Sequence, residues 1–437
     1  MIQTNAAVTK LHRSVPTGST HSQREVWPVT GNTAFLDSAI CALLGVDLTI
    51  PILFPNVGTS GREAIQGSGS LVVFFQFLTA VVILFFIWRT LKIWNALNWR
   101  LLNVRLLSIF LLFCGGSLLW GVVSPIRSLT LWAVFAGSTS FAYYLVKTYT
   151  RDQLALVIGR ALAFLGVVSI LLAVLLPQYG IDSTENVGAW QGAFSQKNYL
   201  GQAMGLYFLT ALAYPRGHQL FRWTSLFISS FLIVMSGSRE AWLALFVAAT
   251  VQLSFTSLKK FQGRNRVSLA SAMLLVALTV GAAAYMQMDA ILLVIGRNST
   301  LTNRTMIWGA ALRVILRRPI LGYGIASTGG TTEWADVATS LNSINLTPAP
   351  HSIYLDGLLR FGAVGSCILL STIIVGLFST ISAFQRDDLK DRILPLSLLL
   401  FLLLVGIASH ELFRAPNLES VIFFASLLAL NGVKSSA

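Results

Sequence analysis

Two arginines and a histidine lie in polar stretches of an otherwise apolar chain, and their side chains are suited to an anionic substrate. Arg239 follows the short sequence Ser236-Gly237-Ser238, and Arg304 ends a stretch rich in Asn, Ser and Thr. A guanidinium fork suits bidentate contacts to phosphate. His351 is one of only five histidines, and an imidazole with an ordinary pKa of about 6.5 suits proton transfer. We therefore expect the two arginines to hold an anion and His351 to move a proton.

Further candidates for binding phosphate or sugar oxygens lie in similar stretches. Arg297 begins the turn rich in Asn, Ser and Thr, and Lys197 and Asn198 follow Ser195, which is expected to cap a helix. Lys197 and Arg239 also have simpler structural explanations. Lys197 could extend toward lipid headgroups, and Arg239 could anchor a span end at the membrane surface. Both interpretations stay open at this point.

The remaining substrate-binding candidates are Tyr354, Arg318 and Glu411. Tyr354 lies one turn after His351, on a helix expected to run into a membrane span. Arg318 follows an amphipathic helix expected near the membrane surface over residues 303–316. For this arginine, binding of membrane lipid headgroups is the simpler explanation. Glu411 belongs to a polar cluster before the last span, where it is a candidate acceptor contact.

The composition is that of a membrane protein. Of 437 residues, 55% are hydrophobic and 11% charged, and the mean hydropathy is +0.71. The formal charge of +14 is what cytoplasmic loops require, so no nucleic-acid partner is expected. Cys41, Cys114 and Cys367 lie far apart in apolar runs. They are interpreted as packing residues, with neither a disulfide framework nor a metal site.

Apolar runs long enough to cross roughly 30 Å of hydrocarbon predict an all-α polytopic protein with about twelve spans. We expect one membrane domain over 33–433, after a polar cytoplasmic tail over 1–32 that lacks the apolar core of a signal peptide. Asp37 makes the first span the weakest. The expected spans are 33–54, 70–90, 104–123, 127–148, 155–176, 196–214, 219–236, 238–256, 267–286, 361–383, 392–409 and 416–433.

The basic residues predict the orientation. Most of the 31 Lys and Arg residues fall in the segments that are inside if both termini are cytoplasmic. The exceptions gather in the second half, on the predicted outer face, above all in a large loop over 287–360. Basic residues placed against this rule indicate an anionic ligand. Asp356 and Arg360, four residues apart at the end of this loop, are interpreted as a local helix pair.

At this point the chain resembles the O-antigen ligase and polymerase superfamily of integral membrane glycosyltransferases. The resemblance covers about 190–365, and Ser352 departs from it because the family usually has Asn after the histidine. The lysine at 197 and the arginine at 318 favour the exopolysaccharide polymerase branch. The matching residues are Gly-Ala-Phe-Ser-Gln-Lys-Asn-Tyr-Leu-Gly at 192–201, Ser238-Arg239, Gly296-Arg297, Arg304, Trp308, Arg318-Pro319, Gly322-Tyr323-Gly324, His351 and Tyr354-Leu355.

The resemblance implies a GT-C-like membrane enzyme of the bacterial inner membrane, with a site on the periplasmic face. It implies a metal-independent, inverting transfer from an undecaprenyl-diphosphate-linked oligosaccharide to a glycan or lipid-core acceptor, without a cofactor. Arg239 and Arg304 would stabilise the departing diphosphate. His351 would be the general base, or a cation on the diphosphate if it is protonated. A chain-length regulator would be a further partner.

Two functions within the family and two outside it remain open. Polymerisation of exopolysaccharide or O-antigen is favoured over ligation to the lipid A core. A flippase or transporter of lipid-linked sugars is the main rival, but such proteins carry polar residues near the bilayer midplane, whereas here they lie at span ends. A non-catalytic assembly scaffold would tolerate substitution of Arg239, Arg304 and His351.

Overall fold

The computed structural model describes most of the membrane domain. It covers residues 31–45, 84–85, 88–89, 99, 101–123, 125–183, 186–257, seven positions between 268 and 279, 302–327, 350–385, 391–409, 411–413 and 417–430. Arg297 lies outside the described residues. Within them the fold is all-helical, and the one β interaction is an isolated bridge between Ile181 and Trp190.

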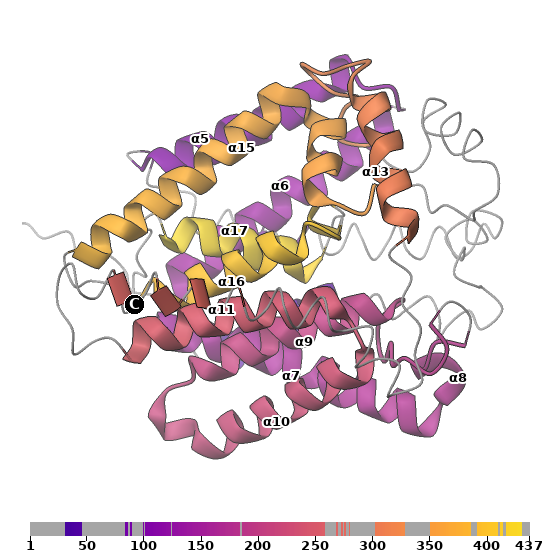
Figure 1. Ribbon diagram of the computed structural model, residues 1–437. Coiled ribbons are helices and arrows are strands. Elements are labelled where there is room, and N and C mark those ends of the chain that lie inside the picture. The colour runs from indigo at the N-terminus through magenta and orange to yellow at the C-terminus, as the bar shows by residue number, and fades with distance from the viewer. Residues whose placement is uncertain are drawn as a thin grey trace, which may run out of the picture.

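The helices form an elongated bundle in which α7, α9, α10 and α11 pack below α16 and α17, with α5 and α15 above (Figure 1). Short 3-10 turns η2, η3 and η5 cover Ser117–Leu119, Arg216–His218 and Glu411–Phe413. The described helices are α1 Gly31–Gly45, α5 Leu102–Gly116, α6 Pro125–Thr148, α7 Arg151–Leu175, α8 Pro177–Gly180, α9 Lys197–Leu212, α10 Gln219–Ser236, α11 Arg239–Ser257, α13 Thr302–Ile315, α15 Ile353–Gln385, α16 Ile393–Val405 and α17 Leu418–Leu430.

Nearly all the expected spans coincide with a described helix, but segments 70–90 and 267–286 lie largely outside the described residues. Within the part of the chain that the structure describes, five helices are long and apolar enough to cross a membrane, and α1, α16 and α17 are shorter apolar helices. The total of twelve spans therefore stays a prediction. The five long helices are Leu102–Leu119, Pro125–Thr148, Arg151–Leu175, Gln219–Ser236 and Ile353–Ala383.

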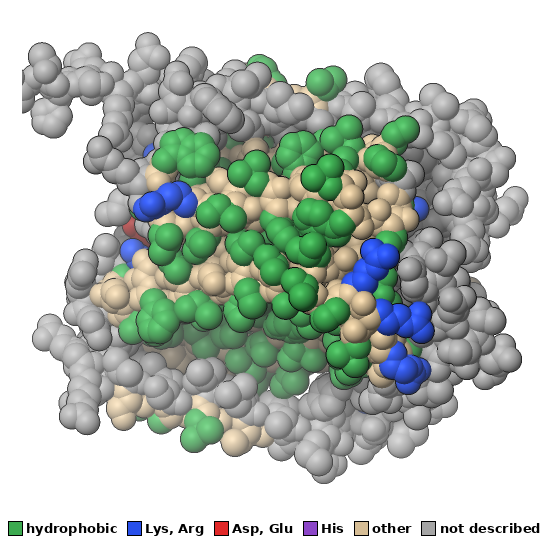
Figure 2. All heavy atoms as spheres, turned by 90° about the horizontal axis from the view of Figure 1, so that it is seen from above, with side chains coloured by type: hydrophobic (Ala, Val, Ile, Leu, Met, Phe, Trp, Pro, Cys, Tyr) green, Lys and Arg blue, Asp and Glu red, His purple; other side chains and the backbone are tan. Residues whose placement is uncertain are grey.

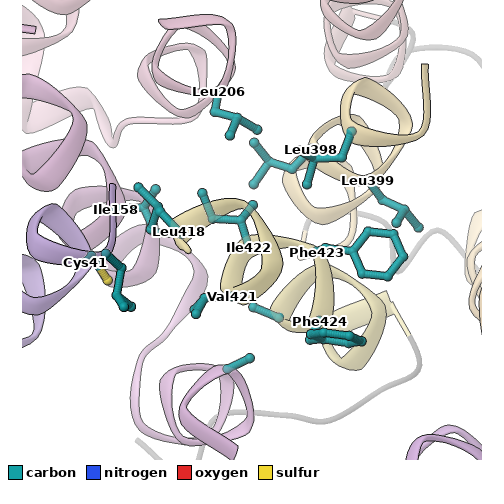
Figure 3. Packing of buried hydrophobic residues seen from close by; sticks show 14 of the residues in the cluster. Cys41, Ile158, Leu206, Leu398, Leu399, Leu418, Val421, Ile422, Phe423 and Phe424 are labelled. Atoms are coloured by element: carbon teal, nitrogen blue, oxygen red, sulfur yellow. The ribbon is translucent and has the colours of Figure 1, made fainter. Parts of the chain in front are cut away.

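Helix α17 lies at the centre of the main hydrophobic core. Its side chains Val421, Ile422 and Phe423 are buried, and they lie among residues of α1, α7, α9 and α16 (Figure 3). On the outer surface, in contrast, many hydrophobic side chains are exposed. Figure 2 shows hydrophobic side chains across the middle of one face and basic ones toward its margins. Exposed residues such as Leu112 on α5 and Phe378 on α15 are what a lipid-facing surface requires.

Several serine and threonine hydroxyl groups inside these helices donate to backbone carbonyl groups of the same helix. Ser138 and Thr139 in α6 donate to the carbonyl groups four residues earlier, at 2.9 Å each, and Ser229 in α10 does the same at 2.7 Å. Backbone and hydroxyl groups have no water partner in hydrocarbon, so such internal bonds are what makes these residues tolerable there. The small hydroxyl residues therefore fit apolar spans without forming a site.

Asp37, which interrupts the expected first span, is neutralised by residues far along the chain. Its carboxylate accepts hydrogen bonds from Arg89 at 2.5 Å, from Tyr144 at 3.1 Å and from Tyr149 at 2.6 Å, and it is fully buried. Arg89 also lies over the rings of Trp88 and Tyr144. Burial and the bond to Asp37 raise the pKa of Tyr149, which follows α6. This buried ion pair ties α1 to α6 and to the helical segment around Arg89.

Candidate functional site

The start of α9 packs against the turn between α10 and α11. Gly201, one helical turn after Lys197, is the contact point, because a Cβ built there would lie 2.6 Å from the Cβ of Ser238 and 3.0 Å from the Oγ of Ser236. The absence of a side chain at Gly201 thus permits the close approach. As a result, Lys197 and Arg239 lie at the same end of two packed helices.

The turn that carries Arg239 is held rigidly. Gly237 ends α10 in the left-handed region with φ 60°, as the C-terminal position of a helix commonly requires. The hydroxyl of Ser236 accepts from the amide of Ser238 at 3.3 Å and donates to the carbonyl of Ile233 at 2.8 Å. Both serines are fully buried, whereas Arg239 is half-buried. The predicted tight turn is therefore confirmed, and it fixes where the Arg239 side chain begins.

His351 lies at the entrance to α15 in an uncommon backbone conformation. Its φ is 47°, which is the only positive φ found for a non-glycine residue among those described. Such a conformation costs on the order of 1 kcal/mol or more and persists only where neighbours enforce it. Ser352 is buried, its carbonyl accepts from the amide of Asp356 at 2.9 Å, and Ile353 donates to the carbonyl of Gly406 at 2.8 Å. Hydrogen bonds at the two residues that follow His351 therefore hold this turn.

The C-terminal end of α16 connects the His351 turn to α9. Gly406, at that end, accepts the hydrogen bond from Ile353. Three residues later, the hydroxyl of Ser409 donates to the side-chain oxygen of Gln202 in α9 at 3.4 Å, and both residues are buried. Gln202 directly follows the contact glycine Gly201. The structure thus brings the starts of α9, α11 and α15 together at one end of the bundle, the side of α8 and α13 in Figure 1.

The remaining candidates are placed less completely. Arg304 belongs to α13 and Glu411 to η5, and of each of these two residues only the backbone is described. The expected helix over 303–316 is confirmed as α13. Arg318 is exposed and its guanidinium lies 5.2 Å from the ring centre of Tyr323. Tyr354 is half exposed, and its hydroxyl donates to the carbonyl of Leu403 at 2.8 Å.

One local expectation was wrong. Helix α9 begins at Lys197, so its N-cap residue is Gln196, whose side chain makes no capping hydrogen bond. Ser195 precedes the cap and does not fill the expected role. The same end of α9 packs against Ser236 and Ser238 through Gly201, a contact that the local sequence pattern does not contain.

Sequence reasoning missed the residues that join the elements. Gln202, Ser409 and Gly406 carry no recognisable motif, yet they connect α9, α16 and α15. A small residue at 201 in the first turn of a helix was the available signal, because small residues allow close helix approach in membranes. The predicted local pair of Asp356 and Arg360 is confirmed, with a separation of 3.0 Å.

In its described residues the protein is all-helical, with apolar helices of membrane type, and α9, α11 and α15 begin at the same end of the bundle. Residues 224–370 match the model of the O-antigen ligase family. This region contains the turn with Arg239, helix α13 and the His351 turn. The resemblance to the O-antigen ligase and polymerase superfamily is thereby confirmed, and the protein is a bacterial membrane protein.

A relative among characterised bacterial proteins agrees with this assignment. The chain is 22% identical over 276 residues to the exopolysaccharide production protein ExoQ of Rhizobium meliloti (strain 1021). The match covers 59% of this chain and 58% of ExoQ, so less than two thirds of that protein is spanned.

Proposed function

We propose that the protein is a membrane glycosyltransferase that polymerises lipid-linked glycan at the periplasmic face of the inner membrane. The observation that carries this proposal is the convergence of Lys197, Arg239 and His351 at one end of the bundle. Three contacts support the convergence: Gly201 with Ser238, Gln202 with Ser409, and Ile353 with Gly406. Cations and an imidazole from three separate helices would then face one ligand.

The proposed donor is an oligosaccharide linked to undecaprenyl diphosphate. An acceptor hydroxyl attacks the anomeric carbon, and the bond from that carbon to the diphosphate oxygen breaks with inversion. The hydroxyl proton passes to His351, which acts as general base. The leaving undecaprenyl diphosphate keeps the bonding electron pair, so its negative charge grows as the bond breaks. Arg239 and Arg304 stabilise that charge, which makes the role of a bound metal ion unnecessary.

Lys197, Asn198, Arg297, Arg318, Tyr354 and Glu411 have secondary roles in this proposal. Lys197 and Asn198 begin α9 beside the Arg239 turn, where an ammonium group and an amide can hold phosphate or sugar oxygens. Arg297 and Arg318 are further phosphate contacts. Tyr354, half exposed beside His351, and Glu411, just before α17, are contacts to glycan.

Polymerisation is preferred to ligation because the matched relative is an exopolysaccharide production protein. Ligation to the lipid A core is the alternative within the same family description. Polymerisation and ligation break the same bond of the donor, between the anomeric carbon and the diphosphate oxygen. Only the acceptor differs. A glycan acceptor that is itself lipid-linked gives a lengthening chain, and a chain-length regulator is then an expected partner.

The test uses the full chain purified into lipid nanodiscs together with polyprenyl-diphosphate-linked oligosaccharide extracted from the source bacterium. New glycosidic bonds and released undecaprenyl diphosphate, detected by mass spectrometry, support the enzyme. A second preparation in sealed liposomes measures movement of the same lipid across the bilayer. Movement without new glycosidic bonds would show a carrier and overturn the proposal.

A further inference from the structure

Helix α15 is broken nine residues after it begins. Gly362 has φ 60° and ψ −165°, so the backbone leaves the helical conformation there and resumes it at once. The result is a short first half over 353–361 and a long second half over 363–385. In Figure 1 the first turns of α15 run beside α13, at an angle to the long remainder. A break of this kind frees carbonyl and amide groups that need other partners.

The segment from Pro319 to Gly324 supplies those partners on both sides of the break. The carbonyl groups of Leu359 and Arg360 accept from the amides of Tyr323 and Gly324, at 2.8 and 2.9 Å. In the other direction, the amides of Ala363 and Val364 donate to the carbonyl groups of Pro319 and Ile320, at 2.8 and 3.1 Å. The inserted segment therefore provides hydrogen-bond partners for two carbonyl groups before the break and two amides after it.

Gly322 and Gly362 make the insertion sterically possible, because neither position has room for a Cβ. Gly322 has φ 67°, and a Cβ built on it would lie 2.6 Å from the backbone nitrogen of Gly362 and 2.7 Å from the carbonyl oxygen of Arg360. Any side chain at Gly322 would thus push the inserted segment away from the break. The two backbones meet directly, which defines their relative position more narrowly than side-chain packing would.

Arg360 adds a side-chain connection at the same place. Its Nε lies 3.0 Å from both carboxylate oxygens of Asp356, one turn earlier, and its Nη1 donates to the carbonyl of Ile325 beyond the inserted segment. Both members of the ion pair are buried. The planar guanidinium can reach two partners at a fixed angle, which a single ammonium group cannot do.

The first part of α15, the inserted segment and α13 pack together as a small body, which is joined to the main core through Ile353 and Phe361. Ile307, Ala310 and Val314 of α13 form a hydrophobic cluster with Tyr323 of the inserted segment and Leu359 of α15, and this cluster is separate from the main core. The body carries the backbone position of Arg304, in α13, and the His351 turn at the start of α15. The His351 turn is also joined to the main bundle by the bond from Ile353 to Gly406, and Arg239 is joined to the bundle by the contact of Ser238 with Gly201.

We propose that Arg360 is a positioning residue that holds α13, and with it Arg304, in place relative to His351 at the start of α15 and to Arg239 in the main bundle. This inference rests on the proposed function only in one respect, because the proposed function names Arg304, His351 and Arg239 as the functional groups. The joint itself, formed by Asp356, Arg360 and the 319–325 segment at Gly362, follows from the contacts above. Arg360 acts through the backbone of α15 and the Ile325 carbonyl rather than by touching the substrate.

The test measures geometry and kinetics in the same variants, in the full chain in nanodiscs with the exposed Cys367 replaced by Ser. Spin labels at Leu312→Cys on α13 and Phe246→Cys on α11 report the distance between the small body and the bundle. Labels at Phe246→Cys and Leu171→Cys, both within the bundle, are the reference pair. All three labelled positions are exposed. The variants are Arg360→Met, Arg360→Lys and the control Leu370→Ala, an exposed position on the long half of α15.

Both Arg360 variants are expected to broaden or shift the distance between α13 and α11, without changing the reference distance. In the glycan transfer assay, kcat should fall by roughly 100-fold for Arg360→Met, with a much smaller change in KM, because misplaced groups cost rate more than ground-state binding. Arg360→Lys keeps a cation for Asp356, so it should fold as the wild type does while still showing the broadened distance. Leu370→Ala should match the wild type.

Wild-type distances and wild-type kcat in Arg360→Lys would overturn the proposal, and this variant decides the matter if Arg360→Met does not fold. Failure of the proposed function gives a different result. In that case Arg239→Ala shows wild-type glycan transfer, or no transfer occurs in any sample, while the distance change in the Arg360 variants persists. A purely structural role for Arg360 would lower protein yield and thermal stability without altering the distance or the kcat of the folded fraction.

Discussion

The hydroxyl of Ser409 donates to the side-chain oxygen of Gln202 at 3.4 Å, although 207 positions separate the two residues in the sequence. Gln202 follows the glycine that contacts the Arg239 turn, and Ser409 follows the glycine that accepts from Ile353. This one contact therefore links the two halves of the candidate site. Substitutions at these packing positions should affect glycan transfer even though the residues themselves carry no charge.

Gly201→Ala is the sharpest test of that packing. The new Cβ would lie 2.6 Å from the Cβ of Ser238, so α9 and the Arg239 turn must move apart. We expect the rate of glycan transfer to fall by about tenfold or more, because small displacements of catalytic groups are costly. Gly217→Ala is the matched control, since nothing lies within 4 Å of a Cβ at that position. Equal activity of the two variants would show that the contact does not position the site.

Arg239→Ala and His351→Ala should lower kcat by about 100-fold or more, because each removes a group that acts mainly in the transition state. Membrane insertion and thermal stability should stay close to those of the wild type. The measurement is the rate of glycan transfer at saturating donor. Arg313→Ala, at an exposed position of α13, is the control for loss of an arginine and should keep most of the activity. Transfer at the wild-type rate in both site variants would contradict the assignment.

Glycan transfer should continue in excess EDTA. The proposed mechanism assigns the charge on the leaving diphosphate to Arg239 and Arg304, and it gives no step to a divalent cation. The measurement compares initial rates with and without chelator in the purified protein. A rate that drops with EDTA and returns with added Mg²⁺ would mean that a metal ion shares this role.

Arg89→Met should destabilise the bundle without altering the site. Removing the arginine leaves the carboxylate of Asp37 buried and unpaired, which costs about 3 to 5 kcal/mol. The double substitution Asp37→Leu with Arg89→Met should cost less than either single one, because no unpaired charge remains. Thermal unfolding in detergent gives the order of the three variants. A double variant less stable than both single ones would contradict this account of the pair.

Much of the helix pattern follows from local sequence, and the contacts between helices do not. Apolar runs of adequate length predict α5, α6, α7 and α10, and the Ser236-Gly237-Ser238 sequence predicts the turn before Arg239. The 3.6-residue period predicts α13. In each of these cases the determining residues are neighbours in the chain.

The pairing of Asp37 with Arg89 could not be predicted in this way. The two residues are 52 positions apart, and the carboxylate alone argued against a span. The break at Gly362 was missed for a similar reason, since a glycine within an apolar run is common and only the inserted 319–324 segment shows why the helix stops there. Such features depend on which segments contact each other in the folded protein, and a single sequence does not record those contacts directly.

The most direct test of the central claim is the accessibility of site positions from one side of the membrane. Lys197→Cys, Arg239→Cys and His351→Cys, each in the Cys367→Ser background, are treated in intact spheroplasts with a thiol reagent that cannot cross the membrane. Lys147→Cys, at the end of α6 and expected on the cytoplasmic side, is the control. We predict labelling of all three site positions from outside, with Lys147→Cys labelled only after permeabilisation. Labelling of some site positions from outside and of others only after permeabilisation would contradict a single periplasmic site.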